Sequence, residues 1–234
     1  MSQIDAAAPA ANDADAAGAL IRRIAFIAVA ALVLGFAIQA LILATKLSGG
    51  LFPATSSIVA DATNGIAWSL LICVGVGIIT AISKAKPVLA GLLSLMIAPL
   101  AVALAKSSQK IMSGLVSAAE QEAVLSLSAV SALRAIEYGV LGWALARLVQ
   151  RTELRPSRYF GIGALVGLVF GGAIVFFGYQ VAMTKGAPMG AVQVISGIIN
   201  EVLFPIGCAG IIYAGQLVGR SARLIEAAKA AQAS

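Results

Sequence analysis

Long apolar runs separated by short polar connections dominate the chain. A membrane-spanning helix needs about 20 consecutive apolar residues, because a rise of about 1.5 Å per residue must cross about 30 Å of hydrocarbon. The runs are continuous rather than alternating, which favours helices over the strands of a membrane barrel. The segments that meet this requirement are residues 24–45, 66–83, 88–105, 124–149, 159–183 and 202–219. The pattern therefore predicts an all-α membrane protein with six transmembrane helices.

The two ends of the chain differ from these runs. Residues 1–20 are rich in alanine and carry only acidic charges, and so little large apolar surface predicts a flexible tail. The apolar run after Arg22 and Arg23 is too long, and the preceding segment too acidic, for a cleaved signal peptide. We therefore expect this run to remain as the first span. Residues 221–234 are expected to form a C-terminal tail.

Basic residues divide unequally between the two sides of the predicted spans. One side holds eleven of them: Arg22, Arg23, Lys84, Lys86, Arg147, Arg151, Arg155, Arg158, Arg220, Arg223 and Lys229. The other side holds four: Lys46, Lys106, Lys110 and Lys185. Because connections rich in lysine and arginine stay in the cytoplasm, the pattern predicts that both termini are cytoplasmic.

The composition agrees with a membrane location. Hydrophobic residues make up 60% of the chain and charged residues 11%, against about 25% charged residues in a typical soluble domain. The mean hydropathy is +0.99. The net charge of +6 would also suit a nucleic-acid-binding protein, but the basic residues stand at the ends of apolar runs. We therefore expect contact with the lipid bilayer and none with nucleic acid, in a chain whose composition is typical of the bacterial inner membrane.

Residue types that carry much enzyme and metal chemistry are scarce. The chain has no histidine, which excludes His-ligated haem, His-based zinc sites and Ser–His nucleophile pairs. Cys73 and Cys208 each stand alone in an apolar run, without CxxC spacing, as is typical of buried free thiols. We therefore expect no metal, no cofactor and no enzymatic activity.

The lengths of the connections suggest three helical hairpins. The cytoplasmic connections are short, which makes successive helices antiparallel neighbours. The longer external ones span about residues 46–65, 106–123 and 184–201. At an offset of 132 residues, Gly65 aligns with Gly197 and Gly75 with Gly207. This alignment suggests that the hairpin is a structural repeat.

The segment 107–131 leaves two alternatives open. It is rich in serine and carries Ile111, Met112, Leu115 and Val116 at helical spacing. This pattern suits an amphipathic helix that lies on the outer membrane surface. It also suits an extension of the fourth helix, and the sequence does not separate the two.

Arg134 and Glu137 are charged residues inside an apolar run. At a spacing of i,i+3 they share one helical face and can pair. Because each charge costs roughly 2.5–3.5 kcal/mol at the bilayer centre, such residues are candidates for function. Alternatively, the two lie nearer the outer surface, where Arg134 anchors the helix at the interface. Glu201, one turn before Pro205, either meets the dipole at the start of the sixth helix or joins this polar site.

Glycines and arginines form two further patterns. The glycines that mark a packing face are Gly163, Gly167, Gly171 and Gly178 in the fifth span and Gly215 and Gly219 in the sixth. Such faces pack closely within the chain or against a second copy. The basic cluster after the fourth span consists of Arg147, Arg151, Arg155 and Arg158. Its charges follow from the topology, or they bind anionic lipid headgroups or an acidic partner.

Two classes of function fit these patterns. The first is a small transporter or channel for an ion or small solute, as six helices with intramembrane charges indicate. The second is a non-catalytic subunit or scaffold of a larger membrane assembly, as the sparse polar residues and the glycine faces indicate. A cavity of roughly 300 Å³ or more, lined by Arg134, Glu137 and Glu201, would favour the first.

Overall fold

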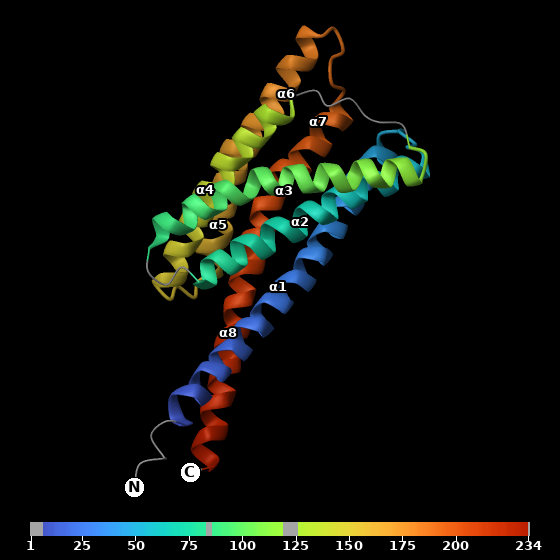
Figure 1. Ribbon diagram of the computed structural model, residues 1–234. Coiled ribbons are helices and arrows are strands. Elements are labelled where there is room, and N and C mark those ends of the chain that lie inside the picture. Colours follow the sequence, from blue (N-terminus) through green and yellow to red (C-terminus); the bar gives the residue numbers. More distant parts are fainter. Residues whose placement is uncertain (1–6, 83–85, 119–125, 234) are drawn as a thin grey trace.

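The computed structural model describes residues 7–82, 86–118 and 126–233, and this part of the chain is helical with no strand (Figure 1). The elements are α1 (Ala7–Ser48), α2 (Thr55–Ile82), α3 (Pro87–Leu115), α4 (Leu127–Gln150), α5 (Pro156–Val166), η1 (Gly167–Gly171), α6 (Gly172–Thr184), α7 (Ala191–Ile198), η2 (Ile199–Leu203) and α8 (Phe204–Ala233). The short elements η1 and η2 are π-helical. Through them, α5 continues into α6 and α7 into α8, each pair as one long helix. The predicted all-α fold is confirmed.

Five helices in the described part of the chain are long and apolar enough to cross a membrane. They span Ala17–Ser48, Thr55–Ala81, Pro87–Leu115, Pro156–Thr184 and Ala191–Ser221. The protein is therefore a multi-pass membrane protein. The fourth predicted span is present as helix α4, but it is not among these five. Arg134 and Glu137 lower its apolar character.

Two helices begin well before the predicted apolar runs. Helix α2 starts at Thr55 rather than at residue 66, and α7 at Ala191 rather than at residue 202. Polar residues in the first turns of α2 and α7 lower the hydropathy of these turns, so the apolar run starts later than the helix does. The connections that remain are turns in which Gly50 and Gly186 adopt positive φ angles of 76° and 73°, a conformation that glycine adopts readily.

The segment 107–131 fits neither alternative over its first part. Residues 107–115 continue α3, so they form neither a separate surface helix nor an extension of the fourth helix. Serines tolerate this position because a hydroxyl can bond back to the preceding turn, as Ser108 does to the carbonyl of Leu104 at 2.9 Å. Residues 119–125, with Glu120 and Glu122, and residues 83–85 of the cytoplasmic turn lie outside the described residues.

The helices at the two ends of the chain run side by side. Helices α1 and α8 are in contact, and the start of α1 lies at the same end of the molecule as the end of α8 (Figure 1). Helix α2 packs on α1, α3 lies against α2 and α4, and α5 packs on α8. Helix α1 begins at Ala7, so most of the acidic N-terminal segment is helical. Its flexibility stays a prediction.

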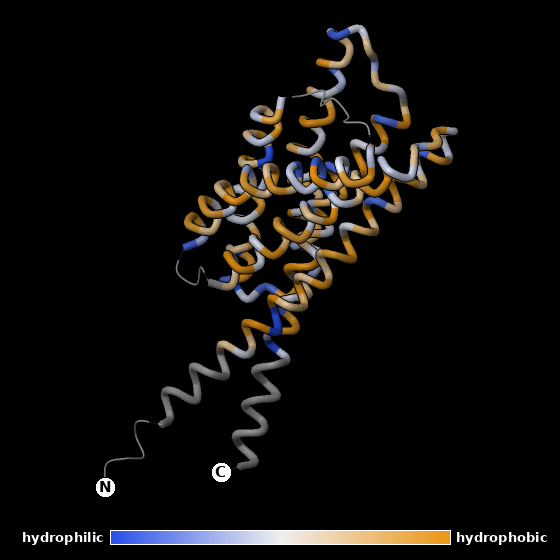
Figure 2. Tube along the Cα trace, turned by 45° about the vertical axis from the view of Figure 1, so that its right-hand side comes forward, coloured by the Kyte–Doolittle hydropathy of each residue, from blue (hydrophilic) through white to orange (hydrophobic). Residues whose placement is uncertain are grey.

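Small residues allow these helices to approach closely. The hydroxyl of Ser69 in α2 donates to the carbonyl of Ala31 in α1 at 2.6 Å. Between α3 and α4, a Cβ added to Gly91 would lie 3.1 Å from the carbonyl oxygen of Gly139. Such backbone proximity is typical of helix packing in membranes. Figure 2 shows hydrophobic residues along most of the bundle, with hydrophilic ones at its ends and a few inside.

Candidate functional site

Helix α4 turns its two charged residues into the bundle. Arg134 is 8% exposed and Glu137 is not exposed at all, so both are buried within the bundle. Arg134 therefore does not reach the protein surface, as an interfacial anchor would. Two ionisable residues thus lie on the inward face of one helix.

Arg134 pairs with Glu201 of η2 rather than with Glu137. Its Nη2 atom donates to both carboxylate oxygens, at 2.6 and 2.7 Å. The amide of Asn200 donates to the Oε1 atom of Glu201 at 2.9 Å. The guanidinium carbon of Arg134 also lies 4.3 Å from the ring centre of Trp68. A cation–π contact and a charge-assisted pair together compensate a charge that is otherwise costly to bury.

Glu137 has no such compensation. Among the residues that the structure describes, none forms a hydrogen bond with either carboxyl oxygen of Glu137. An aromatic cluster covers this region, because Trp68, Tyr138 and Phe204 are in edge or tilted ring contact. A carboxylate without hydrogen-bond donors is costly to bury, so Glu137 lacks the compensation that Arg134 has.

A cavity of about 300 Å³ opens beside the Arg134–Glu201 pair. It lies between α2, α3, α4, α6 and the α7–η2 segment. Its polar lining residues are Asn64, Lys106, Arg134, Asn200 and Glu201, and the rest of its wall is apolar or glycine. Two cationic groups and one carboxylate thus face the same space. Glu137 does not line it, so two of the three predicted polar residues reach this cavity and the third does not.

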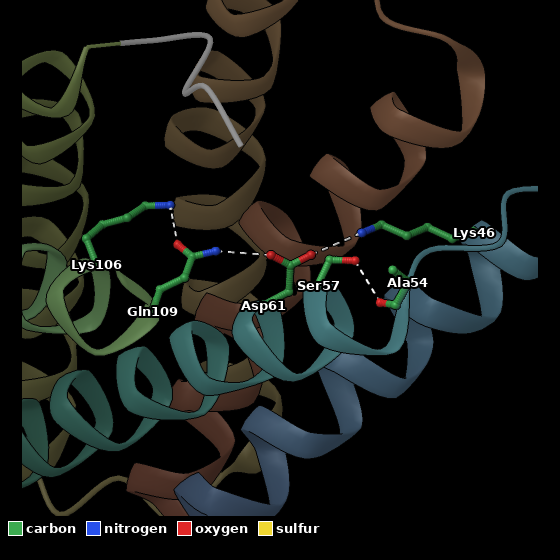
Figure 3. Close-up of polar contacts among 6 residues, drawn as sticks. All are labelled: Lys46, Ala54, Ser57, Asp61, Lys106 and Gln109. Carbon is green, nitrogen blue, oxygen red and sulfur yellow. Dashed lines mark hydrogen bonds and ion pairs between the residues drawn. The ribbon is translucent and has the colours of Figure 1, made fainter. Parts of the chain in front are cut away.

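A chain of polar contacts continues from this cavity toward α1 (Figure 3). The ammonium of Lys106 donates to Gln109 at 2.9 Å, and the amide of Gln109 donates to Asp61 at 3.0 Å. Asp61 in turn pairs with Lys46 at 3.4 Å. From the sequence alone, the two lysines are predicted only as topology signals, and Asp61 is not recognised as a site residue. Asp61 lies before the predicted span 66–83. It would have been a candidate only if the helix had been predicted to begin at Thr55, because a carboxylate inside a membrane helix is unusual.

The two π-helical segments lie against each other beside Glu201. Glu201 is the middle residue of η2, and η2 contacts η1 of the preceding helix. Pro205 lacks an amide hydrogen, so it cannot donate to the carbonyl of Glu201 four residues before it. A π-helical turn is a known way for a helix to accommodate such an interruption, and it is frequent at functional sites.

Three glycines make the contact between these helices possible. A Cβ on Gly171 would collide with the carbonyl oxygen of Glu201, and one on Gly167 would lie 2.5 Å from that of Val202. Gly163 faces the backbone of α8 in the same way. These glycines therefore face a neighbouring helix of the same chain and not a free surface.

The remaining predicted glycines have different surroundings. Gly178 has open space around it and lines the cavity beside Glu201. Gly215 and Gly219 of α8 lie against Arg23 and Ile27 of α1. Of these three glycines, Gly178 is the one that lines the cavity.

The predicted basic cluster is at the other end of α4. All four arginines are exposed, at the end of α4 and the start of α5. The Arg147 guanidinium carbon lies 5.3 Å from the ring centre of Trp143, and Arg158 pairs with Glu153 at 3.0 Å. Arg151 and Arg155 are exposed. The cluster is separate from the polar site.

The described residues contain no group of three or more cysteine or acidic side chains arranged to hold a metal ion. Comparison with protein-family models, with curated proteins and with solved structures finds no match to this chain. Function must therefore be inferred from the site itself.

Proposed function

We propose that the protein is a small transporter or channel for an ion or small polar solute, and not an enzyme. The observation that carries this proposal is the cavity of about 300 Å³ lined by Lys106, Arg134 and Glu201. Its volume lies in the range of small-molecule sites, and its few polar groups converge within an apolar wall. Because cations and a carboxylate face the same space, the cavity suits a charged or zwitterionic solute.

Interrupted helices beside this cavity support transport over a purely structural role. Transporters commonly build their sites where helices are broken, because the freed backbone groups and flanking side chains can contact the solute. Here Glu201 stands in the π-helical segment η2, one turn before Pro205. Gly163, Gly167 and Gly171 pack against a helix of the same chain, which removes one argument for a scaffold that uses them to bind other subunits.

We further propose that α4 crosses the membrane, so that six spans place both termini in the cytoplasm. The start of α1 and the end of α8 lie at one end of the molecule, which an even number of crossings produces (Figure 1). Adding α4 to the five candidate spans gives that even number. We also propose an inner-membrane location, with the apolar helices in contact with lipid, on the basis of the composition and of the basic residues in the connections.

The cavity also supports the proposed hairpin repeat. Gly65 and Trp68 line one part of it, and Gly197 and Asn200 line another. These two pairs are related by the offset of 132 residues on which the repeat rests. A site between equivalent segments of two repeats is the usual arrangement in transporters with internal symmetry.

Flux through the protein tests the proposed function. In proteoliposomes assayed with chloride, potassium, protons and radiolabelled glycine, we expect flux of at least one probe above protein-free liposomes. Lys106→Gln and Glu201→Gln should lower it by about tenfold or more, because each removes a charged group from the cavity.

Each variant has a matched control. Lys110→Gln removes a lysine one turn further along α3, and Glu137→Gln removes a carboxyl that does not line the cavity. Both should keep flux within about twofold of wild type. Equal flux in folded wild type, Lys106→Gln and Glu201→Gln would contradict the proposal. Absence of flux, with foreign subunits in a mild native-membrane purification, would favour the assembly subunit instead.

Cysteine labelling tests the crossing of α4. Ser117 and Ser157 are exposed and flank this helix, whereas the native Cys73 and Cys208 are fully buried. With a membrane-impermeant maleimide on intact cells, Ser117→Cys should react at once and Ser157→Cys only after permeabilisation. Reaction of both variants from the same side would contradict a crossing by α4, and the reverse pattern would contradict the proposed orientation.

A further inference from the structure

A second and larger cavity lies far from the Arg134–Glu201 pair. It has a volume of about 650 Å³ and is formed where α1, α2, α8 and the end of α4 meet. Its polar lining residues are Arg23, Thr80, Gln150, Thr152, Gln216 and Arg220. None of the described residues that line it is acidic, so its charge is positive.

The lining presents hydrogen-bond donors that are held in place. The Nη2 atom of Arg23 donates to the hydroxyl of Thr80 at 3.2 Å, and that hydroxyl donates to the carbonyl of Gly77 at 3.0 Å. The side-chain nitrogen of Gln216 is buried, and no described residue forms a hydrogen bond with it. A buried donor without an acceptor is costly, so an acceptor brought by a ligand would stabilise this site.

Glycines of α8 determine where the Arg23 side chain lies. A Cβ on Gly219 would lie 3.5 Å from Cδ of Arg23, and one on Gly215 would lie 3.7 Å from its Cγ. The aliphatic part of Arg23 therefore runs along α8, and its guanidinium extends to α2. Three helices thus hold the arginine before any ligand arrives.

The cavity lies at the level where the apolar parts of α1 and α8 end. Arg23 stands at the start of the apolar part of α1, and Arg220 follows the apolar part of α8. Figure 2 shows hydrophilic segments at this level, where α1 and α8 leave the bundle. Phosphate groups of the lipid headgroups lie at the ends of membrane spans, where lysine and arginine contact them.

We propose that this cavity binds a phosphate group, supplied by the headgroup of an anionic phospholipid or by free phosphate. Two guanidinium groups and the amide of Gln216 contact its oxygens, since arginine presents a planar set of donors that matches phosphate geometry. This site is distinct from the exposed basic cluster at Arg147–Arg158, and it does not depend on the proposed transport function.

Lipid retention by the detergent-purified full-length protein tests this proposal. Native mass spectrometry would follow retention of phosphatidylglycerol and phosphatidylcholine, and a separate titration would use inorganic phosphate. Arg220→Gln removes an exposed guanidinium, and Gln216→Glu places a carboxylate in the cavity with little change of shape. Each should weaken binding by about tenfold or more. Arg155→Gln removes an equal charge at the same end of the bundle, outside the cavity, and should bind as wild type does.

The two probes separate a lipid headgroup from free phosphate. Phosphatidylglycerol binding that both variants weaken, and that excess inorganic phosphate does not displace, assigns the site to a lipid headgroup. Binding of inorganic phosphate that both variants weaken, without preference for phosphatidylglycerol, assigns it to free phosphate. If Arg220→Gln and Gln216→Glu bind both probes as tightly as wild type and Arg155→Gln do, the proposal is wrong.

Discussion

Arg134→Met is expected to lower the free energy of unfolding by about 3–5 kcal/mol. The substitution keeps most of the side-chain volume but leaves Glu201 without its cationic partner. The side chains of this pair are 9% and 11% exposed, so water compensates little of the lost interaction. Unfolding by SDS in mixed micelles, followed by tryptophan fluorescence, to which Trp68 beside the pair contributes, measures this change.

Two further variants separate the ion pair from general packing. The double variant Arg134→Met with Glu201→Met should recover much of the lost stability, because it leaves no unpaired buried charge. Arg147→Met removes an exposed arginine from the same helix and should change the free energy by less than about 1 kcal/mol, because only its exposed contact with Trp143 is lost. A loss of under about 1 kcal/mol in Arg134→Met, or a double variant as unstable as the sum of the single ones, would contradict this interpretation of the pair.

Gly171→Ala is expected to lower the free energy of unfolding by about 1–3 kcal/mol. The added methyl group would meet the carbonyl oxygen of Glu201, and Gly167→Ala would meet that of Val202 in the same way. A flexible side chain could move aside, but a backbone carbonyl moves only with its helix. The two long helices would therefore have to separate where η1 contacts η2. The same SDS titration measures the effect.

The neighbouring Gly172 offers a matched control. It has no atom within 4 Å of an added Cβ, so Gly172→Ala meets no obstacle. Because alanine favours a helix over glycine by up to about 1 kcal/mol, this variant should be neutral or slightly stabilising. Equal destabilisation by Gly171→Ala and Gly172→Ala would show that helix conformation, and not contact with η2, explains the effect of replacing Gly171.

The apolar runs predicted most of the helices because backbone groups in lipid must bond within their own helix. The predicted boundaries failed at Thr55 and Ala191, where the helices continue through polar residues. Hydropathy marks where lipid can surround a helix and does not mark where the helix begins. The same limitation explains why Asp61, in the early turns of α2, was not recognised as part of a polar network.

The candidate site was predicted only in part. Arg134, Glu137 and Glu201 were recognised because charges inside apolar runs are costly and need a partner or a role. The helical spacing placed Arg134 and Glu137 on one face and suggested that they pair. Spacing within one helix cannot show which residue of another helix pairs with the arginine. In the structure, Glu201 pairs with Arg134 in place of Glu137.

The sequence by itself determined the class of protein, the approximate position of its apolar helices and the glycine face of the fifth predicted span. These features depend on local composition and periodicity, which are properties of each helix by itself. Only the tertiary structure decided that Arg134 bonds a carboxylate 67 residues away, that Glu137 is left without a partner, and that Lys106 faces the same cavity. These pairings depend on how the helices pack against one another, and packing is a property of the whole bundle.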